Sequence, residues 1–312
     1  MSLPAVAVLD IGSNSIKILV ATKDGRGRIV PVFTKSLDAR ISAGISAAAP
    51  RLSDEGMARG LAAIHELLAA ARPHSPVAAQ LVATSAVRDA ANGAEFCERI
   101  LRETGFAVRI LTGTEEAQLI GQGLTCDPAL ADLGNFYVFD LGGGSLECLA
   151  FRERRIEQAV SLPLGCVRLT EKFVADPVAP LGDPQRAAIT SHTQITVLRS
   201  GFRFNLPAGA AVATGGTVSS LRAVIGARTG QKAEDTPPLV TVSQLRDTLD
   251  RLAALPLEER KKVAGLPPDR ADVFPAALAT LLAIAEDAEF PAFRHSFYNL
   301  RYGLAAELLA PL

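Results

Sequence analysis

The sequence predicts an α/β protein made of two similar lobes, and three observations lead to that prediction. Short apolar strands alternate with amphipathic helices along the chain. Residues 5–36 read as strand, tight turn, strand, turn and strand, and residues 136–162 repeat this order. The 312 residues suffice for two domains of about 150 residues each. We therefore expect lobes over 1–124 and 125–312, with the last helix, 301–309, able to pack back on the first lobe.

Local signals set the other elements of the first lobe. Apolar residues at helical spacing predict a helix over 53–71, with Ser53 as its N-cap. The segments that follow are predicted as a strand over 80–84, a helix over 93–103, a strand over 108–111 and a helix that begins at Glu115.

After its three strands, the second lobe is predicted to be mostly helical. One short strand is expected near 211–213. The helices are expected over 167–174, 184–204, 217–225, 243–252, 271–285 and 301–309.

Composition excludes several function classes. The 32 basic and 33 acidic residues give a formal charge of -1, so no global field favours nucleic acid or an anionic membrane as a partner. Mean hydropathy is high at +0.23, but no apolar run reaches the roughly 20 residues of a bilayer span. Asp10 interrupts the first apolar run before it could form a signal-peptide core. We therefore expect a cytoplasmic protein. We also expect a homodimer, which composition does not address.

The cysteines and histidines indicate no metal or disulfide framework. The four cysteines include no C-x-x-C pair, and the four histidines show no ligand spacing. We assign neither set any chemistry.

The first chemical signal is the turn after the strand-end residue Asp10. Gly12, Ser13, Asn14 and Ser15 offer backbone N–H groups and short polar side chains, which suit an anion such as phosphate. An ordinary hairpin with polar turn residues would give the same pattern.

A second turn, in DLGGGSLE over 140–147, strengthens the phosphate interpretation. Three consecutive glycines follow the strand-end residue Asp140, and glycine is needed where backbone bends sharply or approaches a ligand closely. No lysine follows, so the segment is not a P-loop. Glu147 either reaches the turn or lies at a solvated strand edge. The binding candidates are Gly142, Gly143, Gly144 and Ser145.

A third glycine turn, in VATGGTVSSL over 212–221, leads from a strand into a helix. Gly215, Gly216 and Thr217 therefore lie at a helix N-terminus, where N–H groups and the helix dipole favour negative charge. The order of the three turns resembles the acetate kinase, sugar kinase, heat-shock 70 and actin superfamily. That resemblance implies two ribonuclease H-like lobes with an interlobe cleft.

Further segments resemble one branch of that superfamily. ATSAVRDAAN over 83–92, GTEEAQLIGQG over 113–123 and SLPLGCVRLTEKF over 161–173 are similar to the exopolyphosphatase and guanosine pentaphosphate phosphohydrolase family. The resemblance extends from the N-terminus to about residue 221. It is to the short, two-domain form, because 312 residues leave no room for the further HD-like domain.

The resemblance implies a substrate, a cofactor and residue roles. The substrate is inorganic polyphosphate, with guanosine pentaphosphate as the alternative, and the cofactor is Mg²⁺. Glu116 is implied as the catalytic base and Arg88 as a phosphate-binding residue. Asp140 and Glu147 are candidate metal ligands, with Asp10 as a further candidate.

Chemistry alone leaves alternatives at several of these positions. Glu115 and Glu116 are both first-turn carboxylates, and Glu115 is a candidate capping partner of Thr112. Arg88 would serve equally in a surface ion pair. Arg168 and Lys172 lie one helical turn apart and either guide a polyanion or form a solvated basic face.

The chain also departs from the family pattern. Leu146 stands where many members have threonine, and FYNLRYGLAAEL replaces the usual Gly-x-Arg-Glu-Gly stretch near the C-terminus. These positions inherit no role. A kinase of the same superfamily and an actin-like ATP-binding filament protein are the competing hypotheses.

Overall fold

The computed structural model describes residues 3–207, 209–232 and 235–312, and these form two compact units. Unit 1 comprises the described residues up to Ala131 together with Tyr298–Leu312, and unit 2 comprises those within Asp132–Phe297. The first boundary thus follows Ala131, whereas we expected one after residue 124. Helix α4 (Gly113–Thr125) continues past that point, and the short helix η2 (Pro128–Leu130) packs against it.

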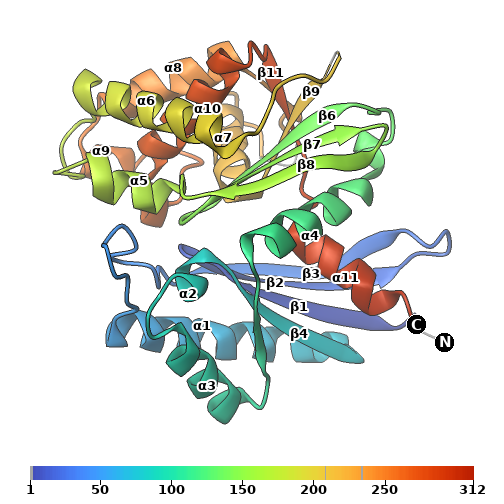
Figure 1. Ribbon diagram of the computed structural model, residues 1–312. Helices are drawn as coiled ribbons and strands as arrows, with labels where there is room; N and C mark the ends of the chain where they lie inside the picture. Colours follow the sequence, from blue (N-terminus) through green and yellow to red (C-terminus); the bar gives the residue numbers. More distant parts are fainter. Residues whose placement is uncertain (1–2, 208, 233–234) are drawn as a thin grey trace. The chain divides into compact units, whose positions relative to one another are not determined.

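Unit 1 contains a five-stranded mixed sheet. Its strands are β1 (Ala5–Ile11), β2 (Ser15–Lys23), β3 (Ile29–Asp38), β4 (Ala78–Ala83) and β5 (Val108–Ile110). They lie in the order β3-β2-β1-β4-β5 (Figure 1). The first three pair antiparallel, whereas β4 and β5 extend the sheet from β1 as parallel strands.

Helices cover both faces of this sheet (Figure 1). They are α1 (Asp54–Ala71), α2 (Ser85–Arg88), α3 (Gly93–Thr104), α4 and α11 (Leu300–Leu309), with the short helix η1 (Arg72–His74). Strand β1 is buried along almost its whole length, as a strand covered on both faces must be. The predicted cap of α1 is confirmed, because the Ser53 hydroxyl accepts a hydrogen bond from the Gly56 N–H at 3.0 Å.

Unit 2 contains a six-stranded mixed sheet. Its strands are β6 (Phe136–Leu141), β7 (Leu146–Arg152), β8 (Arg155–Leu162), β9 (Ala210–Thr214), β10 (Leu239–Thr241) and β11 (Ala292–His295). Their order is β10-β11-β9-β6-β7-β8. As in unit 1, three antiparallel strands come first and β9 and β11 then run parallel to β6. The predicted α/β class with two ribonuclease H-like sheets is confirmed.

Strands β10 and β11 were not predicted, because with 3 and 4 residues they are too short to show a period in the sequence. The helices of unit 2 are α5 (Cys166–Phe173), α6 (Asp183–Ser200), α7 (Gly215–Ala227), α8 (Val242–Ala253), α9 (Leu257–Arg260), η3 (Pro268–Arg270) and α10 (Phe274–Asp287). The apolar run predicted as a helix over 271–285 becomes α10, which packs against α5, α6, α7 and α8. Within the described ranges, the helices are too short or too polar to cross a bilayer.

Candidate functional site

The first glycine turn joins β1 to β2 and is held mainly by side chains, together with a backbone bond from the Arg40 N–H to the Asn14 carbonyl at 2.8 Å. The hydroxyls of Ser13 and Ser85 lie 3.0 Å apart, and both side chains are buried. The Asn14 amide accepts a hydrogen bond from Arg40 Nε at 3.3 Å and donates to Asp38 Oδ1 at 3.5 Å. Sequence reasoning missed Ser85, because it approaches the turn from the start of α2.

The backbone of this turn remains available to a ligand. In the part of the chain that the structure describes, the N–H groups of Gly12, Ser13 and Asn14 donate to no protein acceptor. Successive unbonded N–H groups in a turn form a concave donor surface for an anion. The structure therefore places these three predicted residues where they can bind phosphate oxygens.

Glu116 and Arg88 form a partly buried ion pair within unit 1. Arg88 Nη1 donates to Glu116 Oε2 at 2.8 Å and to the Leu111 carbonyl at 3.0 Å. The side chain of Glu116 is only 8% exposed, whereas that of Arg88 is 22% exposed. The pair thus fixes the orientation of an otherwise enclosed carboxylate, and Arg88 keeps an edge toward solvent.

Glu115 has a structural role at the start of α4. Its carboxylate accepts hydrogen bonds from the Thr112 N–H and from Arg109 Nη2, both at 2.8 Å, and the Thr112 hydroxyl caps the Glu115 N–H. These bonds, that from Arg109 foremost, lower the pKa of Glu115 to about 2. The predicted capping partnership with Thr112 is confirmed.

Asp10 is the penultimate residue of β1 and lies beside Lys17, its register partner on β2. Burial raises the pKa of the Asp10 carboxyl above its usual range, and the charges of Lys17 and Arg301 oppose that rise. The candidate site residues of unit 1 are Asp10, the first turn, Arg88 and Glu116.

The second glycine turn, between β6 and β7, is held by backbone hydrogen bonds. The N–H groups of Cys166 and Val167, at the start of α5, donate to the carbonyls of Gly142 and Gly143, both at 2.9 Å. Arg168 Nε donates to the Gly144 carbonyl at 3.0 Å. Gly165 touches the turn so closely that a Cβ there would collide with the backbone of Gly143.

This arrangement turns the carbonyls of the glycines toward α5. Among the described residues, no acceptor takes a hydrogen bond from the N–H of Gly143, Gly144 or Ser145. The predicted residues of the second turn thus present a second surface of backbone donors suited to an anion. Arg168, predicted to guide a polyanion or to form a solvated face, instead braces this turn.

Asp140, Glu147 and Ser161 lie in one row across β6, β7 and β8. Asp140 is the register partner of Glu147, and Glu147 is the register partner of Ser161. The Ser161 hydroxyl donates to Glu147 Oε1 at 2.7 Å, and Glu147 is 2% exposed. Opposite residues of antiparallel strands project to the same face, so the two carboxylates are neighbours. The alternative of a solvated strand-edge glutamate is therefore wrong.

The third glycine turn meets the Asp140 carboxylate. β9 runs beside β6, with Thr214 as the register partner of Asp140. Gly215 has a φ of +86°, and a Cβ there would collide with Asp140 Oδ1. The Thr217 hydroxyl donates to the Leu141 carbonyl at 2.9 Å. In unit 2, the structure therefore brings the second and third turns together around Asp140.

Arg270 is a site residue that sequence reasoning missed. Its guanidinium lies against Gly216, where a Cβ would come within 2.6 Å of Nη2. Buried Arg260 holds the segment that carries Arg270, because its Nη1 donates to the Ala271 carbonyl at 3.0 Å. No motif spacing links Arg270 to the glycine turn, so only the fold reveals the contact.

The described residues contain no group of three or more histidine, cysteine, aspartate or glutamate side chains arranged to hold a metal ion. A Mg²⁺ ion needs fewer than three protein ligands, because it commonly keeps several waters and binds one or two carboxylates together with substrate phosphates. The neighbouring carboxylates of Asp140 and Glu147 fit that donor set.

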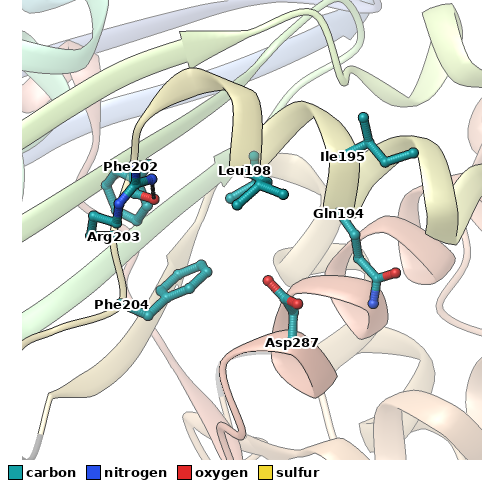
Figure 2. A pocket seen from close by; sticks show the side chains of 8 residues that line it. Gln194, Ile195, Leu198, Phe202, Arg203, Phe204 and Asp287 are labelled. Carbon is teal, nitrogen blue, oxygen red and sulfur yellow. Dashed lines mark hydrogen bonds between the residues drawn. The ribbon is translucent and has the colours of Figure 1, made fainter.

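A cavity of about 340 Å³ lies elsewhere in unit 2, at the C-terminal ends of α6 and α10 (Figure 2). Leu198, Phe204 and Asp287 are among its lining residues, and none of the predicted site residues is. It is therefore separate from the glycine turns.

Comparison with solved structures shows the same fold. An exopolyphosphatase from Cytophaga hutchinsonii is 22% identical, with a TM-score of 0.87 over 99% of this chain and 98% of that one. The Aquifex aeolicus PPX-GPPA enzyme is 24% identical, with a TM-score of 0.78 over 98% and 100% of the two chains. The family model of the Ppx/GppA phosphatases matches residues 19–311. The chain therefore belongs to the Ppx/GppA phosphatase family.

Proposed function

We propose that the protein is an exopolyphosphatase that removes the terminal phosphate from inorganic polyphosphate by attack of water. The observation that carries the proposal is the second glycine turn, whose carbonyls are bound by α5 while three N–H groups are left for an anion. Family membership supports a phosphohydrolase. Backbone donors that are already oriented stabilise a transferring phosphoryl group without reorganisation.

Glu116 is the proposed base. Phosphoryl transfer to water requires a group that positions the attacking water and accepts its proton. The bond from Arg88 at 2.8 Å fixes the Glu116 carboxylate, and the small exposure of this side chain protects it from bulk water. Arg88, which is 22% exposed and also pairs with Asp89 at 3.5 Å, is the proposed contact to a substrate phosphate.

Mg²⁺ is the proposed cofactor. Asp140 and Glu147, which are register partners on β6 and β7, would hold it, and the carboxyl of Asp10 in unit 1 is a further candidate. When bound, the ion would neutralise charge on the substrate phosphates, which a protein of net charge -1 does not offset alone.

Polyphosphate is preferred over guanosine pentaphosphate in this proposal, because a polymer gains from simultaneous contact at many phosphates. Lys172, which is exposed on α5, is the better candidate for such a contact, since Arg168 is engaged with Gly144. We expect Lys172→Gln to weaken binding of long polymers more than of short ones, and Arg168→Gln to weaken both.

The test is phosphate release measured in parallel on long polyphosphate, tripolyphosphate, guanosine pentaphosphate and ATP, with Mg²⁺ and after exhaustive chelation. We expect the highest kcat/KM with long polyphosphate and loss of activity on chelation. A higher kcat/KM with guanosine pentaphosphate would reverse the choice of substrate, and release from none of the four would refute the function.

A further inference from the structure

A buried arginine and histidine lie behind the third glycine turn. Arg222, on α7, is 3% exposed, and His295, at the end of β11, is 5% exposed. Arg222 Nη1 lies 2.7 Å from His295 Nδ1. The same guanidinium also donates to the carbonyls of Thr236 and Pro237, which fix its position.

The chemistry of these groups sets the direction of the hydrogen bonds. Arginine only donates, so His295 Nδ1 must accept, and the neutral ring then carries its proton on Nε2. Burial and the charge of Arg222 lower the pKa of His295 to about 3, so the ring is neutral near pH 7.

Ser219 continues the chain of hydrogen bonds to the glycine turn. His295 Nε2 lies 3.2 Å from the Ser219 hydroxyl, which donates in turn to the Gly215 carbonyl at 2.8 Å. Arg222 thus donates to His295, His295 donates to Ser219, and Ser219 donates to the Gly215 carbonyl. The chain of hydrogen bonds ends at one peptide group of the turn.

That peptide group also carries the N–H of Gly216. The Gly215 carbonyl and the Gly216 N–H belong to one planar peptide and point in opposite directions. A carbonyl held toward Ser219, within α7, therefore aims the Gly216 N–H out of the helix N-terminus. The guanidinium of Arg270 lies against the same glycine.

We propose that Arg222, His295 and Ser219 form a positioning relay that orients the Gly215–Gly216 peptide for a phosphate of the substrate. The inference rests on the proposed function, because the peptide is oriented for a phosphate of that substrate. The three side chains themselves do not contact the substrate. Hydrogen-bond donors that are already held in place increase the affinity for phosphate, because less conformational entropy of the protein is lost on binding.

The first test reads the relay directly. Long-range ¹H–¹⁵N NMR of the full chain should show the Nε2–H tautomer of His295 at pH 7 and no protonation down to pH 5. An Nδ1–H tautomer, or an imidazolium at pH 5, would overturn the relay. This readout does not depend on any enzymatic activity.

The second test separates positioning from folding. Ser219→Ala removes the link to Gly215, and Ser219→Thr keeps a hydroxyl that can bond to the same carbonyl. Ser220→Ala is the matched control, because its hydroxyl lies on the same helix and is hydrogen-bonded neither to His295 nor to Gly215 within the described ranges.

We expect Ser219→Ala to raise KM for polyphosphate by about 3- to 10-fold, the loss expected for one hydrogen bond, with a smaller change in kcat. Its Tm should fall modestly, because the Nε2–H of buried His295 loses its acceptor, and KM is therefore compared at a temperature where both proteins are folded. Ser219→Thr should restore KM. Calorimetry with tripolyphosphate, in the Glu116→Gln background to prevent turnover, should show the same loss of affinity.

Equal KM and tripolyphosphate affinity in Ser219→Ala and the parent protein would overturn the relay, as would an equal loss in Ser220→Ala. Failure of the proposed function is a different result, in which the parent protein releases phosphate from none of the four substrates. In that case the relay is still tested by the tautomer of His295 from NMR and by the tripolyphosphate affinities from calorimetry.

Discussion

The first and second glycine turns occupy the same place in the strand order of their units but are held by different means. Side chains hold the first turn, through Ser13 with Ser85 and through Asn14 with Arg40. The N-terminus of α5 holds the second turn by bonding to its glycine carbonyls. Two similar sets of unbonded backbone N–H groups are therefore held mainly by side chains in unit 1, with one backbone bond from the Arg40 N–H to the Asn14 carbonyl, and mainly by backbone in unit 2, with one side-chain bond from Arg168 to the Gly144 carbonyl.

The difference predicts different sensitivities to substitution. The first turn should be the more damaged by removal of a hydroxyl or an amide, because these groups brace it. The second turn should be the more damaged by addition of atoms, because a Cβ at Gly165 would collide with the backbone of Gly143 and Gly144, whereas a Cβ at Gly12 in the first turn would meet one atom, the Ser15 carbonyl oxygen, at 2.9 Å. Unit 1 also contributes the proposed base, so its largest mutational effect is expected on turnover.

Glu116→Gln should produce the largest effect. The amide is isosteric but a poor base, so kcat should fall by about 10²-fold or more, the lower end of what a positioned acid or base contributes. Steady-state kinetics on polyphosphate measures this, with far-UV circular dichroism to verify folding.

Glu115→Gln is the matched control, because the side chain is the neighbouring carboxylate and glutamine preserves the capping box. Its kcat should stay close to that of the parent protein. Near-normal turnover of a folded Glu116→Gln would remove this residue from the mechanism.

Gly165→Ala should produce the next largest effect. The new Cβ would displace either α5 or the second turn, and such overpacking costs about 1–3 kcal/mol of unfolding free energy. Denaturant unfolding measures the loss, and phosphate affinity should fall with it. Gly134→Ala, where a Cβ meets nothing within 4 Å, is the control. Equal stability of the two variants would contradict the backbone account of the second turn.

The features that depend on neighbouring residues could be predicted from the sequence. The Ser53 cap and the Thr112–Glu115 capping box each involve positions three apart, so their signals lie within one helical turn. The strand–turn–strand repeats were equally local. The partners of the site residues were missed because they come from distant segments: the bond between Arg88 and Glu116 spans 28 positions.

The role of Arg168 shows the same limit. Its spacing from Lys172 indicated a shared helix face, but spacing does not reveal that Gly144 approaches that helix. Similarly, His295 shows no ligand spacing in the sequence and acquires its contacts to Arg222 and Ser219 only through the packing of β11 beside β9. Contacts set by sheet order require the structure.

Ser13→Ala and Ser145→Ala compare the two turns directly. Ser13→Ala breaks the buried bond to Ser85 and should lower the unfolding free energy by about 0.5–1.5 kcal/mol. The Ser145 hydroxyl has no hydrogen-bond partner in the described chain, so Ser145→Ala should change stability by less than about 0.5 kcal/mol. Urea unfolding measures the free energy of unfolding of both variants. Equal losses in the two variants would contradict the claim that side chains hold the first turn more than the second.

The smallest expected effect concerns acid stability. The pKa of Glu115 is lowered to about 2 in the folded protein from its ordinary 4.5, so its contribution to stability is present above about pH 4.5. That contribution is lost as pH falls from 4.5 toward 2. Glu115→Gln should therefore lower the free energy of unfolding slightly at pH 7 to 8, where the carboxylate contributes, and should flatten its dependence on pH between 4.5 and 2. A profile parallel to that of the parent protein would show that the bonds from Arg109 and Thr112 do not stabilise the fold.

The most direct test of the account is an NMR titration of the full-length Glu116→Gln protein with tripolyphosphate and Mg²⁺. The central claim is that both turns bind phosphate through backbone N–H groups that the protein leaves unbonded. The amide resonances of Gly143, Gly144 and Ser145 should shift in a saturable manner, together with those of Gly12, Ser13 and Asn14. Saturable binding that shifts resonances elsewhere while these six remain unchanged would contradict the claim.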